Sequence, residues 1–278
     1  MIRVMGVVAL GLLFSSLVSA LDIQGEWQQG AVIQGRVTQG TQVHFLKHDV
    51  RVDKDGLFVI GLGRDAPPEA VITTTNAAGE KTKHNFAVAQ REYRIQKVNG
   101  VPKKTVNPSK EQVARSRKEG ALVWHARQLD LERNDFSEQF QWPLTGPITG
   151  VYGSQRFYNG QPGRPHFGID IAAPTGTVVV APVSGVVTLV HDDMFFSGGT
   201  LIVDHGHGLS STFIHLSKIL VEKGQVLKMG DAIAEVGASG RATGPHLDWR
   251  MNWFEQRVDP QLLVGAMPTS SVPKKTEK

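Results

Sequence analysis

The sequence of 278 residues contains no cysteine and few aromatic residues. A chain without cysteine has no disulfide bond, no thiolate nucleophile, no thiolate zinc ligand and no cysteine for lipid attachment. Aromatic residues make up 7% of the chain, which argues against a large aromatic binding platform. Hydrophobic residues make up 40% and charged residues 20%, without a long block of either charge. These proportions exclude a disordered chain and a protein with several membrane spans, and favour a soluble globular protein of two domains.

A marked excess of one charge is also lacking. The 30 lysines and arginines against 26 aspartates and glutamates give a formal net charge of +4. The basic residues are scattered and no nucleic-acid-binding motif accompanies them, so we expect no nucleic-acid partner. The 30 glycines and 14 prolines imply many turns between short strands.

Residues 1–20 form an apolar leader. The segment carries one charge at Arg3, continues with apolar residues and ends in the small residues Ser19 and Ala20. This pattern predicts a signal peptide, and therefore an exported protein that is periplasmic or secreted. An uncleaved anchor helix is the alternative, but the apolar stretch is shorter than the roughly 20 residues that span a bilayer. We expect no transmembrane span after cleavage of the leader.

Residues 21–99 show short alternating runs of apolar and polar side chains. Val43 and Phe45 share one face of such a run, and Asp55-Gly56 between two apolar runs is a hairpin signal. The segment predicts an N-terminal β-sandwich-like module. Its histidines have no partner spacing, and we find no chemistry in it.

Residues 100–141 predict a short helical linker. Ser109 and Gln112 form a capping-box pattern that opens a charged helix, which continues through Leu122 and Trp124. We interpret the charges of this helix as a solvated face. Residues 266–278, with three lysines, predict a disordered tail.

Residues 142–265 return to glycine-punctuated strands and predict a second domain, so that the fold class is all-β. Six of the ten histidines fall between His166 and His246, which sets this domain apart. The sequence places strands at residues 148–152, 168–172, 177–181, 185–190, 200–204, 209–215 and 232–236.

His166 and Asp170 are the first pair that points to chemistry. On an extended strand both side chains lie on one face with only Gly168 between them, while the intervening apolar residues face the core. Zinc accepts this mixture of imidazole nitrogen and carboxylate oxygen, and the gap at Gly168 leaves room for an ion. A surface histidine and aspartate on one face are also common without a metal.

Two more strands add groups of the same kind. His246 and Asp248 share a face behind a glycine-rich turn, and His215 ends a third strand. Imidazole and carboxylate groups from three strands are typical of a hydrolytic metal site on a rigid sheet. We interpret the remaining run, residues 204–208, as a glycine-rich hairpin with exposed imidazoles and not as a second metal cluster.

These residues lie in several ordered motifs, and with them residues 142–260 resemble the M23 family of zinc metallopeptidases, the lysostaphin-like cell-wall endopeptidases. The resemblance implies a lysostaphin-like antiparallel β-sheet peptidase domain that opens on a groove, a single Zn²⁺ ion and hydrolysis of peptide bonds in peptidoglycan. The motifs are Arg164-Pro165-His166-Phe167-Gly168-Ile169-Asp170, Val203-Asp204-His205-Gly206, Phe213-Ile214-His215-Leu216 and Thr243-Gly244-Pro245-His246-Leu247-Asp248.

The resemblance also implies a role for each site residue. His166 and Asp170 fall on zinc ligands, whereas His215 and His246 fall on catalytic residues that do not bind the metal. The third ligand of the family is a histidine, but this sequence has Asp248. A second carboxylate ligand brings the formal charge of a bound Zn²⁺ to zero, which makes the ion a weaker Lewis acid.

The sequence therefore predicts an exported zinc metalloendopeptidase acting on peptidoglycan. Arg156 and Asn159, in the loop of residues 154–163 before the first ligand strand, are candidate substrate-binding residues, with a plain loop as the alternative. Asp248 keeps two other interpretations open. One is a catalytically inactive protein of the same fold that binds murein or activates a partner cell-wall amidase, and the other is an enzyme with a different metal.

Overall fold

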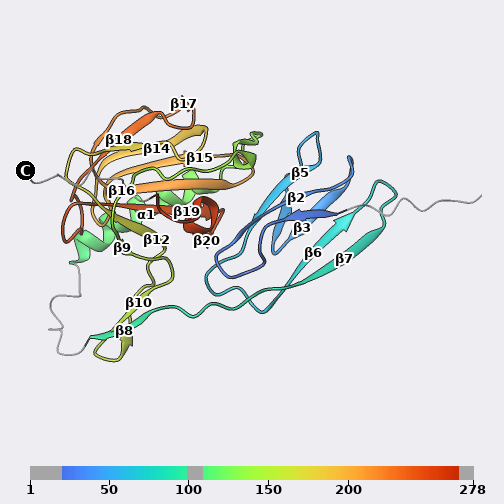
Figure 1. The fold of residues 1–278 in the computed structure, drawn as a ribbon, viewed down its shortest axis with the longest axis horizontal. Helices are drawn as coiled ribbons and strands as arrows, with labels where there is room; N and C mark the ends of the chain where they lie inside the picture. The colour runs from blue at the N-terminus through green and yellow to red at the C-terminus, as the bar shows by residue number, and fades with distance from the viewer. Residues whose placement is uncertain (1–20, 99–108, 269–278) are drawn as a thin grey trace, which may run out of the picture.

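The computed structural model describes residues 21–98 and 109–268, so the predicted leader and most of the predicted tail lie outside the described residues. The N-terminal module consists of two antiparallel sheets (Figure 1). Val43, Phe45 and Ile72 are buried at alternate positions of their strands, as the sequence pattern predicts. One sheet has the order β1 (Asp22–Gln24), β2 (Val32–Arg36) and β5 (Leu57–Gly61), and the other β4 (His48–Val50), β3 (Gln42–Phe45), β6 (Glu69–Thr75) and β7 (Lys81–Ala87).

The hairpin signal at Asp55-Gly56 forms the turn before β5. The Oδ1 atom of Asp53 accepts hydrogen bonds from the backbone N–H groups of Asp55 and Leu57, both at 2.8 Å. Gly56 has a φ of +82°, which a residue without a Cβ adopts at little cost. Side-chain capping and glycine together fix this turn.

A ten-stranded antiparallel sheet forms the C-terminal domain, so the expected all-β fold class is confirmed (Figure 1). Alternation on β19 places Leu247 and Trp249 in the core and leaves His246 and Asp248 on the opposite face. The main path of the sheet is β17 (Val226–Leu227), β14 (Gly185–Met194), β15 (Gly198–Asp204), β16 (Leu209–Ile219), β19 (His246–Trp253), β12 (Gly168–Ala172) and β9 (Ile148–Gly150). β18 (Ala232–Val236) pairs with β16 and with β13 (Val178–Val180), and β20 (Gln256–Val258) pairs with β19.

The two parts of the chain share one hydrophobic core, because β19 and β20 pack against β5. A Cβ atom at Gly61 would lie 2.5 Å from the Cβ of Trp253, so glycine permits the close approach of these strands. The backbone N–H of Asp259 donates to the carbonyl of Gly30 at 2.7 Å, and Asp259 also pairs with Arg91 at 2.9 Å. The short helix α2 (Gln261–Val264) follows this junction.

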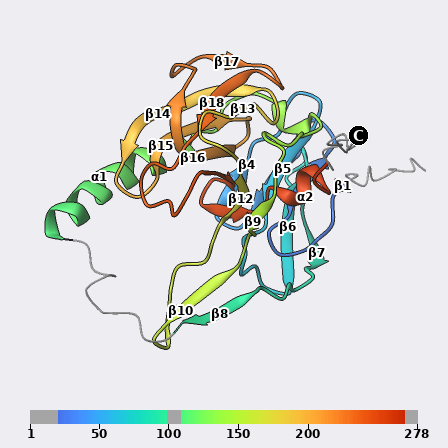
Figure 2. The ribbon, with the colours of Figure 1, turned by 60° about the vertical axis from the view of Figure 1, so that its left-hand side comes forward.

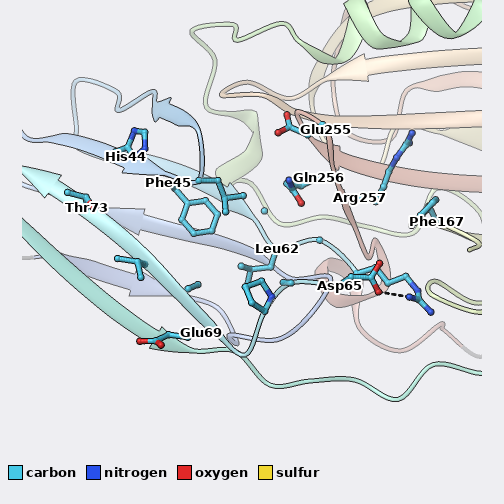
Figure 3. A pocket seen from close by; sticks show the side chains of 18 of the residues that line it. His44, Phe45, Leu62, Asp65, Glu69, Thr73, Phe167, Glu255, Gln256 and Arg257 are labelled. Atoms are coloured by element: carbon cyan, nitrogen blue, oxygen red, sulfur yellow. Dashed lines mark hydrogen bonds and ion pairs between the residues drawn. The ribbon is translucent and has the colours of Figure 1, made fainter.

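A cavity of about 730 Å³ lies beside this junction (Figure 3). Phe45 and Leu62 line it from the module, and Phe167 lines it from the C-terminal domain. The Arg257 side chain points away from this cavity, toward the C-terminal domain.

Helix α1 (Lys110–Arg127) begins at the predicted capping box, in which Ser109 and Gln112 exchange hydrogen bonds. The helix packs on the C-terminal sheet through Val123 and Ala126, which contact a cluster formed by Leu189, Met194 and Ile202. The helix continues through Leu122 and Trp124 as the sequence predicts, and both side chains are exposed. In the described part of the chain, no helix combines the length and the apolar character that a membrane crossing requires.

A small separate sheet flanks the C-terminal domain (Figure 2). β8 (Ile95–Val98) pairs in parallel with β10 (Gln155–Tyr158), and β10 pairs with β11 (Gln161–Pro162). The chain that leaves the N-terminal module thus adds a strand to the loop that precedes β12. After α1 the chain forms one 3₁₀ turn, η2 (Asp135–Ser137).

Candidate metal centre

His166 and Asp170 face each other at the start of β12. The Nε2 atom of His166 lies 3.2 Å from the Oδ1 atom of Asp170. Both atoms are buried, and neither has a hydrogen-bond partner within the described residues. Buried polar atoms without a partner are costly, so their pairing around a shared open position indicates a ligand site.

Asp248 completes a group of three ligand atoms. It lies directly opposite Asp170 in the register of β12 and β19, and the ligand atoms of His166, Asp170 and Asp248 all lie within 4.8 Å of one another. Nitrogen and carboxylate oxygen atoms are ligands that zinc accepts. The residues present therefore fit a metal ion of this kind.

Arg250 holds the Asp248 carboxylate from the same face of β19. Its Nε atom donates to Oδ1 and Oδ2 of Asp248 at 2.9 and 3.1 Å, and its Nη2 donates to Oδ2 at 2.6 Å. Burial alone would raise the pKa of Asp248, but the charge and hydrogen bonds of Arg250 outweigh burial and lower that pKa. The carboxylate is therefore ionised, and its remaining lone pairs still face the ligand group.

Two glycines make room for these carboxylates. A Cβ atom at Gly168 would lie 2.3 Å from Oδ1 of Asp248, and a Cβ atom at Gly150 would lie 2.2 Å from Oδ2 of Asp170. The gap at Gly168 thus accommodates the Asp248 carboxylate and the Arg250 side chain, and not only an ion as the sequence suggested.

His215 and His246 stand next to the ligand group with their rings 4.9 Å apart. The Nδ1 atom of His215 lies 2.8 Å from the carbonyl of Ser239, and that of His246 lies 2.8 Å from the carbonyl of Gly244. A carbonyl only accepts, so in each neutral ring Nδ1 carries the proton and Nε2 is the acceptor. The Nε2 atom of His246 lies 3.8 Å from Oδ1 of Asp170.

His215 does not end its strand, as the sequence suggested, but interrupts it. β16 continues to Ile219, and His215 has a φ of +66° where the register between β15 and β16 shifts, between Phe213 and Leu216. Because Ile214 pairs with Asp248, regular alternation would place His215 on the other face of the sheet. The left-handed backbone breaks this alternation, and the ring reaches His246. Burial lowers the pKa of His215, which keeps the ring neutral over a wider pH range.

A groove of about 500 Å³ adjoins the ligand group. Arg156 lines it together with His166 and Asp170, and its Nε donates to Gln96 of β8 at 3.1 Å. Asn159 lies in the turn between β10 and β11, with a φ of +50°. The structure thus brings Arg156, but not Asn159, to the lining of this groove.

The hairpin at residues 204–208 corrects the sequence interpretation. His205 and His207 are 0% and 2% exposed, so the expected exposed imidazoles are buried. The ring nitrogens of His205 lie 2.8 Å from the carbonyl of Ser184 and 2.8 Å from Oγ of Ser211. The chain that follows α1 covers the hairpin, because the N–H of Phe136 donates to the carbonyl of His205. His205 is a packed structural residue.

Comparison with known proteins identifies the family. Residues 164–260 match the family model of peptidase family M23. This domain belongs to that family. A crystal structure from Pseudomonas aeruginosa assigned to peptidase M23 aligns with 87% of this chain and 96% of that one, with a TM-score of 0.70 and 29% identity. The likeness therefore includes much of the N-terminal module, and the lysostaphin-like β fold of the M23 domain is confirmed.

Curated relatives match a shorter part of the chain. Over 111 residues the chain is 38% identical to the peptidoglycan DD-endopeptidase ShyA of Vibrio cholerae, which covers 40% of this chain and 25% of that protein. Over 106 residues it is 38% identical to the DD-carboxypeptidase/endopeptidase Mpg of Neisseria meningitidis, which covers 38% of this chain and 24% of that protein. The chain spans about a quarter of the length of these two relatives.

Proposed function

We propose that this protein is an exported zinc-dependent endopeptidase that hydrolyses peptide bonds of peptidoglycan. The observation that carries the proposal is that buried atoms of His166 and Asp170 face each other with no hydrogen-bond partner in the described part of the chain, and that a ligand atom of Asp248 lies within 4.8 Å of both. The names of the curated relatives supply the substrate class. The apolar leader at residues 1–20 supports export.

His166, Asp170 and Asp248 would hold the zinc ion. When bound, zinc acts as a Lewis acid that polarises a peptide carbonyl and makes water a nucleophile at neutral pH. His215 and His246 would handle the protons, because each presents an unprotonated Nε2 beside the ligand group. Such an atom accepts a proton from the attacking water, and once protonated it donates to the leaving amine.

Arg250 alters the charge that the sequence alone suggests for this site. The formal charges of a Zn²⁺ ion and two carboxylate ligands add to zero. The guanidinium of Arg250, which is bound to Asp248, raises this total to +1. An ion with one carboxylate and two imidazoles has the same sum. The pair of Asp248 and Arg250 thus has the net charge of a neutral imidazole, so the charges summed around a bound ion would equal those of the family's ligand set.

A catalytically inactive M23-fold protein, which binds murein or activates a cell-wall amidase, is the second candidate. The observation that favours it is that Arg250 already contacts both oxygens of Asp248. A metal ion would have to share this carboxylate with the guanidinium.

Digestion of purified sacculi separates the two candidates. The zinc-loaded protein, the chelator-treated protein and the His215→Ala variant are incubated with sacculi, and released peptides are identified by mass spectrometry. The proposal expects cleaved stem peptides or cross-links from the zinc-loaded protein alone, with activity restored by zinc after chelation. A protein that binds sacculi equally well with and without zinc, and releases nothing, would establish the inactive candidate.

A further inference from the structure

A second cavity, of about 340 Å³, lies between helix α1 and the face of the sheet that carries the candidate metal centre. Four arginines from four different segments line it, and we call it the arginine cavity. They are Arg127 at the end of α1, Arg164 before β12, Arg250 on β19 and Arg257 on β20. No segment of the chain places more than one of them, so the cluster is a product of the tertiary fold.

The four guanidinium groups lack matching negative charge. Only Arg250 binds a carboxylate, that of Asp248, within the part of the chain that the structure describes. Arg127 is 7% exposed; its Nη2 donates to the hydroxyl of Thr212 at 2.9 Å, and its Nε has no partner within the described residues. Arg257 donates to the side-chain oxygen of Asn252 at 3.1 Å.

The acidic side chains of the cavity wall are already engaged. Glu119 accepts hydrogen bonds from Arg115 and from the backbone N–H of Phe195. Glu255 pairs with Lys47 at 3.0 Å and with His48 at 3.1 Å. Neither carboxylate therefore neutralises an arginine of the cavity, and positive charge exceeds negative charge there.

Burial makes this excess costly. Burial lowers the pKa of Arg127, and the charges of Arg257, Arg250 and Arg164 lower it further. Burial likewise lowers the pKa of Arg257, to about 9, with Arg250 and Arg164 again adding to the effect. A buried cation with neutral partners is unfavourable, and an anion that enters such a site gains charge-assisted hydrogen bonds.

The arginine cavity adjoins the groove of the candidate metal centre. Arg164 and Arg250 line both spaces, and His166 and Asp170 line the groove side. Arg164 and Arg257 also lie over the ring of Phe167, at 5.7 and 5.6 Å from its centroid, which fixes their position. Figure 3 shows the Arg257 side chain directed from the interdomain cavity toward this domain.

We infer that the arginine cavity binds a carboxylate group of the peptide substrate. The inference rests on the proposed peptidase function for the identity of the ligand, because Arg164 and Arg250 place the cavity beside the groove in which a peptide substrate would bind. Planar guanidinium groups bind carboxylates in a bidentate manner, and Arg127 has an unused Nε donor for one. The carboxylate is either the C-terminal one or that of an acidic side chain.

A binding experiment with chelator-treated protein tests this inference without any need for hydrolysis. The probes are N-acetyl-D-alanyl-D-alanine, its C-terminal amide and N-acetylglutamate 1-amide, each titrated calorimetrically at low salt. The carboxylate probes are expected to bind at least about tenfold more tightly than the amide, the difference of one charge-assisted pair. Preference for the dipeptide or for the glutamate derivative assigns the carboxylate to the C-terminus or to a side chain.

Arg127→Gln and Arg257→Gln are the test variants, and Arg117→Gln is the control, since Arg117 is an exposed arginine of the same helix. The inference expects a loss of about tenfold or more in carboxylate affinity for the test variants and none for the control. Glutamine at position 127 keeps a donor for Thr212 and removes an uncompensated charge, so the Tm of Arg127→Gln should not fall. If it does fall, Arg257→Gln alone tests the inference. Equal binding of acid and amide probes, or unchanged affinity in both test variants, would overturn the inference. Carboxylate binding by a protein that releases nothing from sacculi would sink the peptidase proposal alone.

Discussion

The M23 domain contains two places where histidine and aspartate meet, and they differ in the partners of their polar atoms. At His166 and Asp170 the facing atoms are buried and have no hydrogen-bond partner among the residues that the structure describes. At Asp204 and His205 the polar atoms are engaged: both ring nitrogens of His205 have oxygen partners, and Asp204 accepts a hydrogen bond from Gly206. We therefore assign the first pair to metal binding, as proposed above, and the second to packing, and the hydrogen-bond partners distinguish them.

The largest expected effect is that substitution of His166 or Asp170 removes the metal, whereas substitution of His205 does not. His166→Ala and Asp170→Ala should each abolish stoichiometric zinc binding, because each removes one of three ligands. His205→Gln should retain zinc, although the loss of a packed ring lowers its stability. Metal content is measured by mass spectrometry of purified, folded protein. If His166→Ala retained zinc at the wild-type level, His166 would not differ from His205 in metal binding and would not be a ligand.

The next effect separates proton transfer from metal binding. His215→Ala should keep the zinc and lower hydrolysis of sacculi by about 10²- to 10⁴-fold, the typical contribution of a general acid or base. His191→Ala is the control, since that partly exposed ring lies on β14, away from the ligand group. A variant that loses zinc along with activity would make His215 a ligand.

The buried residues Asp204 and His205 should make the stability of the protein depend on pH. Burial raises the pKa of Asp204 to about 7, so its contribution to stability is present at acid pH and is lost as the pH rises toward 7. Burial lowers the pKa of His205 to about 4, so its contribution is present above pH 6.5 and is lost as the pH falls toward 4. In the wild type these two trends oppose each other.

Asp204→Asn should expose the histidine trend. Asparagine keeps the acceptor for Gly206 but does not titrate, so the stability of the variant relative to wild type should increase between pH 4 and 7, by up to a few kcal/mol. Urea unfolding at several pH values measures the difference. A difference that stays constant over this range would show that Asp204 is not buried as a carboxyl group.

The smallest expected effects come from two glycines. Gly150→Ala places a Cβ 2.2 Å from Oδ2 of Asp170, so that carboxylate must move and zinc affinity should fall by about tenfold or more. Gly120 lies on α1 with no atom within 4 Å of an added Cβ. Gly120→Ala should therefore leave zinc affinity unchanged and raise stability by about 0.5–1 kcal/mol. Competitive titration with a zinc chelator and thermal unfolding compare the two variants.

Sequence periodicity predicts much of the M23 domain. It gives β12 and β18 their observed bounds and pairs His166 with Asp170, because alternate residues of a strand share a face, whereas the resemblance to the family added Asp248 to this pair. The same rule could have found Arg250, which continues the series of His246 and Asp248 on β19. Arg250, the partner of Asp248, was not among the residues predicted from the sequence.

Other features have no local signal. The positive φ of His215 depends on the bulged pairing of β16, and alternation places that residue on the wrong face. The burial of His205 depends on the segment after α1, some 70 residues earlier in the chain. The arginine cavity likewise joins the end of α1, the segment before β12 and the paired strands β19 and β20. Such contacts arise from tertiary packing, which a single sequence does not display.

The role of Asp248 is the point on which the account depends most, since Arg250 already binds that carboxylate. Zinc content of the Asp248→Ala variant beside the wild type tests it directly. We predict one zinc per wild-type chain and none in the variant, because Asp248 is the third ligand. Unchanged stoichiometric zinc in Asp248→Ala would contradict the account and would leave the pair of Asp248 and Arg250 as a structural ion pair.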